Sequence, residues 1–406
     1  MRLLWDLIIK NGNILTLDAP LKKNSNCILI KNGIISDIVD CETAKNLQAQ
    51  KIIDATGLTV MPGLIDCHTH LCEYATEGVH HTIGKSQKMA AISNYLDCLK
   101  SGITTVGDHH LGHPLLSTPL SELKHTAGNI ALTVKFTAGM CCLGTEPLSY
   151  TSSLKPGSNL TFDDFNDEHF AKLAVESEFP GENIFVTATV ANLPPALVPN
   201  GGKLIFNSKD ICKIVDIFHA AGKRIGAHIE GAENIQIFID AGGDVIHHGH
   251  GAENAQFIQM ANKKIALVAT PHGGTSRSPN TPEDIYNALN ANVVTAIATD
   301  SYLPVHPQAM GLGNLKIVGP KDFLAICKPT FEYLNNKGIS KTDCLKLITV
   351  NAAKIMGLDL EIGSIKKLKR ADIILCKGVP VFDFTNIESI AAVIKEGVIE
   401  INNSGL

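Results

Sequence analysis

The pattern of apolar and polar residues separates a central part of the chain from its two ends. Up to about Thr56, short alternating runs are separated by turn signals such as Asn32 and Gly33, which is typical of a small β-sheet module. Similar runs return near the other end, in residues 371–376 and 390–401. We therefore expect β-structure at both ends, where the two segments either pair with each other or form two separate flaps.

Between these ends, short apolar runs alternate with helical patterns. Residues 208–221, for example, carry apolar side chains at the spacing of one helix face. The apolar runs suit parallel strands, which are buried on both faces. They end near His70, His109, Gly139, Val190, His228, His248, Thr270 and Asp300. This alternation predicts an α/β protein with a (β/α)8 TIM barrel, in which the long segment 139–159 is either a substrate cover or a surface loop.

The simplest organisation pairs the chain ends into one β-sandwich beside the barrel. We place the first part of this sandwich at residues 1–57, the barrel at 58–358 and the second part of the sandwich at 359–406. A length of 406 residues exceeds one average domain. It suits a barrel with a small accessory module.

The most informative run is 61–70, an apolar strand that ends in His68 and His70. Alternate side chains share one face of a strand, so both histidines can bind one metal ion while Thr69 faces the packing side. The pair alone is a weak signal, because the chain contains sixteen histidines. Three later strands strengthen it, since they end in His228, His248 and Asp300 at the edge where a barrel keeps its active site.

In the order of these motifs, the chain resembles the amidohydrolase superfamily, the metal-dependent barrel hydrolases that include imidazolonepropionase, cytosine deaminase and the prolidase-like peptidases. The resemblance extends over nearly the whole length, through residues 6–12, 62–70, 102–106, 220–231, 351–354 and 369–374. It implies that the metal ligands are His68, His70, His228 and Asp300. It also implies that the two chain ends pair into one sandwich.

The resemblance assigns catalytic roles to three residues. Asp300 could ligate the metal and also accept the proton of the bound water, because a metal lowers the pKa of that water to about 7. His248 precedes a glycine as the sixth-strand histidine of the family does, so we assign it to the site and His247 to packing or to a bond with a ligand. Glu230 could carry a proton to a leaving nitrogen. Relatives place that glutamate one position later, where this chain has glycine, and Glu233 is the fallback.

The fourth strand bears on the number of metal ions. Binuclear relatives carry a carboxylated lysine there, whereas residues 182–190 contain no lysine and no carboxylate near their carboxyl end. Two cations without a bridging anion repel each other, so we expect one divalent ion. Zn2+ is preferred, with Fe2+ or Mn2+ as alternatives. Lys135 could substitute as a bridge, although a solvated lysine is the simpler interpretation.

Several further side chains are candidates around the mouth of the barrel. We expect His109, His272 and Arg277 to contact the substrate, and Arg277 could hold a carboxylate in a bidentate fork. Tyr302 and His306 follow Asp300 in the sequence and are weaker candidates.

Composition limits the class of protein. The net charge of −5 and a pI near 6.3 give no basic excess, which argues against nucleic acid as a partner and favours a small-molecule substrate.

Eleven cysteines without CxxC pairs indicate reduced thiols in an intracellular protein. Of these, Cys67 and Cys72 flank the histidine pair and are a minor alternative as ligands. With no apolar run long enough for a bilayer and no signal-peptide core, we expect a cytoplasmic protein without a membrane partner. The sequence leaves a homo-oligomer open.

We therefore expect an enzyme that hydrolyses a C–N bond of a small molecule through a metal-activated hydroxide. The bond would belong to an amide, a cyclic amide or an amino-substituted ring, which makes the enzyme a cyclic amidohydrolase or a deaminase. The alternative is a prolidase-like dipeptidase or N-acyl amino acid hydrolase with a binuclear site, because residues 209–249 resemble those peptidases. A metal-binding protein without turnover is a third alternative, disfavoured by the intact ligand set.

Overall fold

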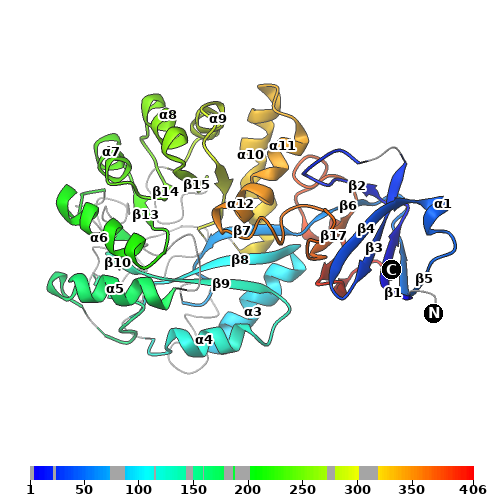
Figure 1. Cartoon of the computed structure of the whole chain (residues 1–406), viewed down its shortest axis with the longest axis horizontal. Helices are drawn as coiled ribbons and strands as arrows, with labels where there is room; N and C mark the ends of the chain where they lie inside the picture. Colours follow the sequence, from blue (N-terminus) through cyan, green and yellow to red (C-terminus); the bar gives the residue numbers. More distant parts are fainter. Residues whose placement is uncertain are drawn as a thin grey trace.

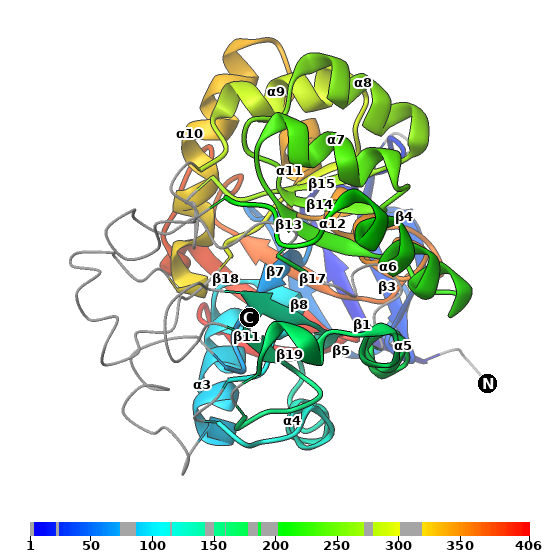
Figure 2. The ribbon, with the colours of Figure 1, turned by 90° about the vertical axis from the view of Figure 1, so that its left-hand side faces the viewer.

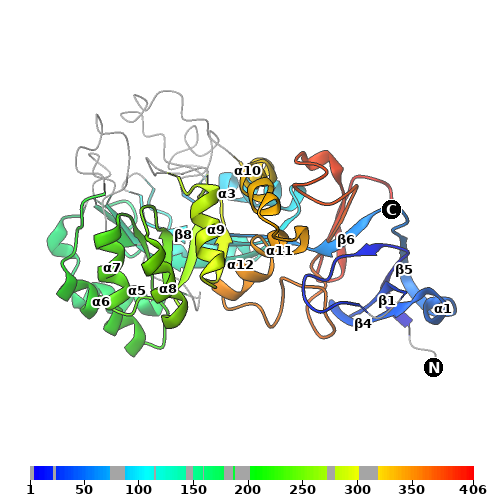
Figure 3. The ribbon, with the colours of Figure 1, turned by 90° about the horizontal axis from the view of Figure 1, so that it is seen from above.

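The computed structural model has a strand-rich part built from both chain ends and a larger part in which strands and helices alternate (Figures 1 and 2). The structure describes residues 4–21, 24–73, 87–113, 116–142, 150–158, 160–177, 186–187, 202–271, 279–300 and 319–406. Seen from above, the two parts lie side by side (Figure 3).

The first sheet of the strand-rich part contains residues of the amino-terminal segment. Its strands lie in the order β4 (Ile34–Asp40), β3 (Ser25–Lys31), β1 (Leu4–Lys10) and β5 (Gln48–Asp54). Helix α1 (Cys41–Ala44) follows β4. Asn32 and Gly33 have φ values of 51° and 75°, the left-handed pair that a tight hairpin between β3 and β4 requires.

The second sheet combines strands from the two ends of the chain. Its order is β19 (Val398–Asn402), β18 (Ile390–Lys395), β17 (Ile373–Cys376), β6 (Thr59–Pro62) and β2 (Asn13–Ile14). One cluster of buried apolar residues includes members of both sheets, among them Ile9, Ile28, Ile53, Ile373 and Ile394. The two ends also pair directly, because Ile34 and Arg370 form a bridge and the amide of Ile35 donates to the carbonyl of Lys369 at 2.8 Å. This pairing excludes the alternative of two separate flaps. A β-sandwich stays an expectation.

A buried ion pair inside the second sheet offers a test of stability. Asp372 and Lys395 are 5% and 4% exposed, and Lys395 Nζ lies 3.0 Å from Asp372 Oδ2. Substitution Asp372→Asn leaves the buried ammonium of Lys395 with only the exposed carboxylate of Glu396, 3.2 Å away, and removes the carboxylate that Arg370 contacts at 2.6 Å. We therefore expect the free energy of unfolding in urea to fall by about 3–5 kcal/mol. The matched control is Glu168→Gln, which removes an exposed pair with Lys172 and should leave the unfolding curve unchanged. An equally small effect of Asp372→Asn would contradict the prediction.

The larger part contains two sheets of parallel strands. One sheet consists of β7 (Leu64–Thr69), β8 (Ile103–His110) and β9 (Thr133–Ala138). The other consists of β12 (Val186–Thr187), β13 (Gly226–Ile229), β14 (Val245–His248), β15 (Ala266–Ala269) and β16 (Thr295–Ile297). The two sheets meet just beyond β16, where the amide of Asp300 donates to the carbonyl of His68 at 3.1 Å.

Helices connect and cover these strands (Figure 1). They are α3 (Gln87–Lys100), α4 (Leu120–Ala127), α5 (Asp167–Glu176), α6 (Ser208–Ala220), α7 (Ala232–Asp240), α8 (Asn254–Lys263) and α9 (Pro282–Asn290), followed by α10 (Phe323–Asn336), α11 (Lys341–Lys346) and α12 (Val350–Ile355). The buried residues Ile211, Ile214, Val215 and Phe218 of α6 form the apolar face that the sequence predicts. None of the helices in the described ranges combines the length and the apolar character that a bilayer span requires.

The comparison with the sequence confirms an α/β fold and corrects one segment. After Gly139, where we expected a loop, the chain forms an antiparallel pair of short strands, β10 (Met140–Cys142) and β11 (Tyr150–Ser152). Met140 pairs with Ser152, Cys141 with Thr151 and Cys142 with Tyr150, a pairing between two segments that the surrounding Ser, Pro and Gly residues do not indicate. The predicted end of the fourth strand at Val190 lies outside the described residues, and a closed barrel stays an expectation.

Candidate metal centre

The candidate site lies at the carboxyl ends of the parallel strands, and a bulge in β7 shapes it. Asp66 pairs with Val106 and Thr69 pairs with Asp108, so β7 has one more residue than β8 between these two pairs. Such an extra residue re-aims the side chains that follow it. His68 therefore lies in the site, while Asp66 accepts hydrogen bonds from the amide and the hydroxyl of Thr299, at 3.1 and 2.6 Å.

Two histidines of β7 and the aspartate after β16 form a compact group of possible ligands. The Nε2 atoms of His68 and His70 lie 3.2 and 3.3 Å from Oδ1 of Asp300, and the three donor atoms are within 4.8 Å of one another. All three side chains are buried. Two imidazole nitrogens and one carboxylate oxygen facing a common point are a donor set that divalent metals such as zinc accept. These residues therefore fit a divalent ion.

The backbone holds Asp300 in an unusual conformation. Its φ is +49°, in the left-handed region that non-glycine residues rarely occupy and that often marks a functional site. Burial favours the neutral acid, but the imidazoles of His248 and His70 outweigh it and hold the pKa of Asp300 below its usual value. Asp300 is therefore ionised at neutral pH and can act as a ligand or accept a proton.

A network behind His70 fixes its ring and the turn that follows. His70 Nδ1 donates to the carbonyl of His109 at 3.2 Å, which leaves Nε2 for the side of Asp300. Asp108 accepts hydrogen bonds from the amide of Leu71 at 2.8 Å and from the hydroxyl of Tyr95 at 2.6 Å. Burial raises the pKa of Asp108 to about 6, although the Tyr95 bond opposes the shift. Sequence reasoning missed Asp108 and Tyr95, and the one available signal was the position of Asp108 directly before His109.

His248 and His228 lie beside the compact group. His248 Nδ1 lies 2.7 Å from the hydroxyl of Thr270 and 3.9 Å from Oδ2 of Asp300. The ring of His228 packs edge-on against that of His248, with 4.3 Å between centroids. Burial lowers the pKa of His228 to about 4 and that of His248 well below its usual range. Within the described residues, His228 is not a member of the compact group, and its assignment as a ligand stays a prediction.

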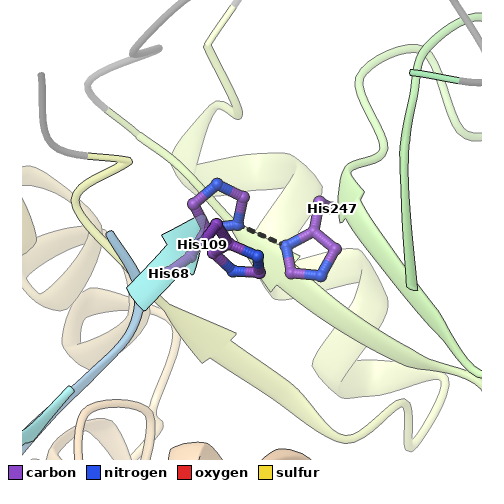
Figure 4. A group of neighbouring side chains, drawn as sticks. All are labelled: His68, His109 and His247. Carbon is purple, nitrogen blue, oxygen red and sulfur yellow. Dashed lines mark hydrogen bonds between the residues drawn. The ribbon is translucent and has the colours of Figure 1, made fainter. Parts of the chain in front are cut away.

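His109 is buried beside other histidines. It is 1% exposed, and its ring nitrogen joins those of His68 and His247 in a second group within 4.8 Å (Figure 4). The neighbouring His110 turns to another partner, because its Nε2 lies 2.9 Å from Oε1 of Glu73. The structure thus places His109 against His68 of the candidate metal site, and contact of His109 with a substrate stays a prediction.

The remaining candidates fall into different surroundings. Glu230 is buried directly after β13, whereas its fallback Glu233 is exposed in the first turn of α7, which favours Glu230. Lys135 is half-buried and lines a pocket of about 350 Å³ beside α4. His272, Arg277, Tyr302 and His306 lie outside the described residues.

The two cysteines beside the histidine pair are buried and form no disulfide. Burial and the carboxylate of Asp108 raise the pKa of Cys72 well above its usual value, so its thiol stays protonated and is a poor ligand. Within the described ranges, neither Cys67 nor Cys72 belongs to a group that could hold a metal ion.

Comparison with known proteins places the chain in a family. The model of the amidohydrolase family matches residues 59–399. The chain belongs to the amidohydrolase family. A dihydroorotase of Elusimicrobium minutum is 42% identical over 101 residues, 24% of this chain and 20% of that protein. An allantoinase of Salmonella paratyphi B is 32% identical over 135 residues, 33% of this chain and 24% of that protein. This amidohydrolase thus aligns with less than a quarter of the length of these curated relatives.

Solved structures share the fold of this amidohydrolase over 97% or more of its length. The crystal structure of a Xaa-Pro dipeptidase with bound methionine has a TM-score of 0.72 at 21% identity, covering 97% of this chain and 99% of that chain. An adenosine deaminase from Xanthomonas campestris with bound zinc has a TM-score of 0.68 at 15% identity, covering 100% of this chain and 95% of that chain. Members with such different names show that the fold alone does not select a substrate.

Proposed function

We propose that this amidohydrolase hydrolyses a C–N bond of a small molecule in the cytoplasm, with one divalent ion, Zn2+ by preference, as cofactor. The observation that carries the proposal is the buried group of His68, His70 and Asp300, whose donor atoms face one point. The local similarity to a dihydroorotase and an allantoinase, both cyclic amidohydrolases, favours a cyclic amide as substrate. A deaminase acting on an amino-substituted ring is the other form of the same proposal.

The proposed architecture follows from the same observations. We expect the two parallel sheets, which meet between β16 and β7, to close into a (β/α)8 barrel over residues 58–358. The segments 1–57 and 359–406 would form the accompanying β-sandwich. The carboxyl ends of the barrel strands would then surround the candidate metal centre, as in other barrels of this type.

In the proposed reaction, His68, His70, Asp300 and His228 would hold the ion. When bound, a divalent ion lowers the pKa of a water molecule to about 7 and polarises a carbonyl. Asp300 accepts the proton of the attacking water, since its carboxylate is ionised at neutral pH. His248 lies beside Asp300 and would stabilise the negative charge that develops on the substrate. Glu230 would deliver the proton to the leaving nitrogen.

A second candidate is a prolidase-like dipeptidase or N-acyl amino acid hydrolase with two ions. It is favoured by the adjacent rings of His228 and His248, which lie beside the compact group and offer a second pair of imidazole donors. The number of ions per chain separates the two candidates.

Removal of the metal tests the proposal. We expect purified protein to contain one divalent ion per chain by elemental analysis and to lose activity on a panel of cyclic amides and aminated heterocycles after dialysis against a chelator. Re-addition of Zn2+ should restore it. A new carboxylate without ammonia identifies a cyclic amidohydrolase, and free ammonia identifies a deaminase. Two ions per chain together with dipeptide hydrolysis would favour the second candidate, and activity that survives complete metal removal would contradict both.

A further inference from the structure

Three imidazoles from three different strands lie together behind the candidate metal site. They belong to His68 of β7, His109 of β8 and His247 of β14 (Figure 4). Each is at most 1% exposed, and one ring nitrogen of each lies within 4.8 Å of the others. The interior of a barrel is usually filled by branched apolar side chains. A buried group of three polar rings therefore calls for a specific role.

The contact between His68 and His247 indicates what that role is. The two Nδ1 atoms lie 2.5 Å apart, and the ring centroids are 4.5 Å apart at an angle of 55°. At this separation the two Nδ1 atoms cannot both carry a hydrogen, so one of them is a hydrogen-bond acceptor. A neutral imidazole carries one hydrogen, on Nδ1 or on Nε2. At this separation one Nδ1 donates and the other accepts.

The other nitrogen of His68 determines the direction of this bond. His68 Nε2 faces Oδ1 of Asp300 at 3.2 Å, and a histidine binds a metal through a nitrogen without hydrogen. If Nδ1 of His68 donates to His247, its Nε2 keeps the lone pair that a ligand needs. His70 is held in the same way, because its Nδ1 donates to the carbonyl of His109. Both histidines of β7 thus bond to the protein through Nδ1 and turn Nε2 toward Asp300.

We propose that His247 is a positioning residue that accepts a hydrogen bond from Nδ1 of His68 and thereby fixes the tautomer and ring direction in which His68 can bind a metal ion. The ring of His109 packs against both, with its centroid 4.2 Å from that of His68 and 5.4 Å from that of His247. The inference rests on the proposed function in one respect, namely that His68 is a metal ligand. Here an imidazole accepts the hydrogen bond from the metal-binding histidine, whereas a carboxylate, a carbonyl or a water molecule usually does so.

The same three histidines could in principle hold a cation of their own, but the geometry argues against it. Two nitrogens that bind one zinc ion at about 2.0–2.1 Å in a tetrahedral arrangement stand about 3.3 Å apart. The observed 2.5 Å between the two Nδ1 atoms is too short for this arrangement. His68 would also have to bind an ion at each of its nitrogens. The geometry favours a hydrogen bond.

Two substitutions at position 247 distinguish the effect of the hydrogen-bond acceptor from the effect of the volume of the ring. In His247→Asn, the amide oxygen occupies a position close to Nδ1 and can still accept, whereas His247→Leu fills the space without an acceptor. His169→Leu is the matched control, because it removes a buried histidine that bonds to Ser152, outside the site. Zinc affinity is measured by competition with a chromogenic chelator. NMR of the ring nitrogens in isotope-labelled, metal-depleted protein reports which nitrogen of His68 carries the hydrogen.

We expect His68 to carry its hydrogen on Nδ1 in the metal-depleted protein and to keep it there in His247→Asn. His247→Leu should lose this preference and bind zinc about 10- to 100-fold more weakly, while His247→Asn and His169→Leu stay within a few-fold of the unsubstituted protein. Hydrogen on Nε2 of His68 would overturn the inference, as would equal zinc binding by His247→Leu. The inference would also be overturned if the unsubstituted protein bound two ions and both variants at position 247 lost one of them. That result would indicate a second cation site at the three histidines. If the unsubstituted protein bound no metal, the proposed function would fail and the inference with it. A protein that binds metal without hydrolytic activity would leave the inference standing.

Discussion

Substitution of Asp300 with asparagine should lower turnover by about 100- to 10,000-fold and still leave most of the metal ion bound. Asparagine keeps the shape of the side chain and an oxygen near the position of Oδ1, which lies 3.2 and 3.3 Å from the two histidines of β7. It has no charge and cannot accept a proton. Because the imidazoles remain, the loss of proton transfer should exceed the loss of metal affinity.

The measurement compares kcat at saturating zinc with the metal content of the same samples. Asp240→Asn is a suitable control, because this aspartate is exposed at the end of α7 and its substitution should change neither quantity. Thermal unfolding of the Asp300 variant shows whether the fold is kept. Unchanged turnover would remove Asp300 from the mechanism, and a parallel loss of metal and turnover would reduce its role to that of a ligand.

Substitution of Asp108 with alanine should weaken both the fold and the metal site. The carboxylate accepts from the amide of Leu71 and the hydroxyl of Tyr95, and each buried donor left without an acceptor costs about 1–3 kcal/mol. The turn after His70 would lose its anchor, so we expect zinc to bind about 10- to 100-fold more weakly, as when partners of metal ligands are removed.

The Tyr95→Phe variant provides a graded comparison. It removes one donor of Asp108 and keeps the bond from the amide of Leu71, so its effect on urea unfolding and on zinc affinity should lie between that of the unsubstituted protein and that of Asp108→Ala. Equal zinc affinity in all three proteins would mean that the turn after β7 does not depend on this network.

The sequence predicts the parts of the molecule that depend on local periodicity. The spacing of apolar residues predicts helix α6, which has one buried face. It also predicts the strands that end near His70, His109, His228 and His248, which are buried on both faces. The convergence of His68, His70 and Asp300 could be expected from the order of the motifs. This convergence depends on distant strands meeting at one edge of the sheet, and local sequence patterns do not predict that meeting.

What the sequence could not reveal depends on register between strands. The extra residue of β7 opposite β8 is set by pairing with another strand, so a strict alternation along β7 would have placed Asp66 and His68 in the same surroundings. For the same reason, the packing of the His109 ring of β8 against the His68 ring of β7 could not be predicted from either segment. The bond between His68 and His247 joins β7 to β14 and leaves no trace in either segment alone.

The second sheet has a consequence for how the protein reaches its native state during synthesis. Met61 and Pro62 of β6 pair with Ile374 and Ile373 of β17, strands that leave the ribosome at very different times. Until β17 and β18 have been translated, β6 has an open edge that can pair with other nascent chains. We therefore expect chaperone dependence to concentrate in this interval, and ribosome-bound chains arrested before β17 to be cleaved readily by protease within β2 and β6.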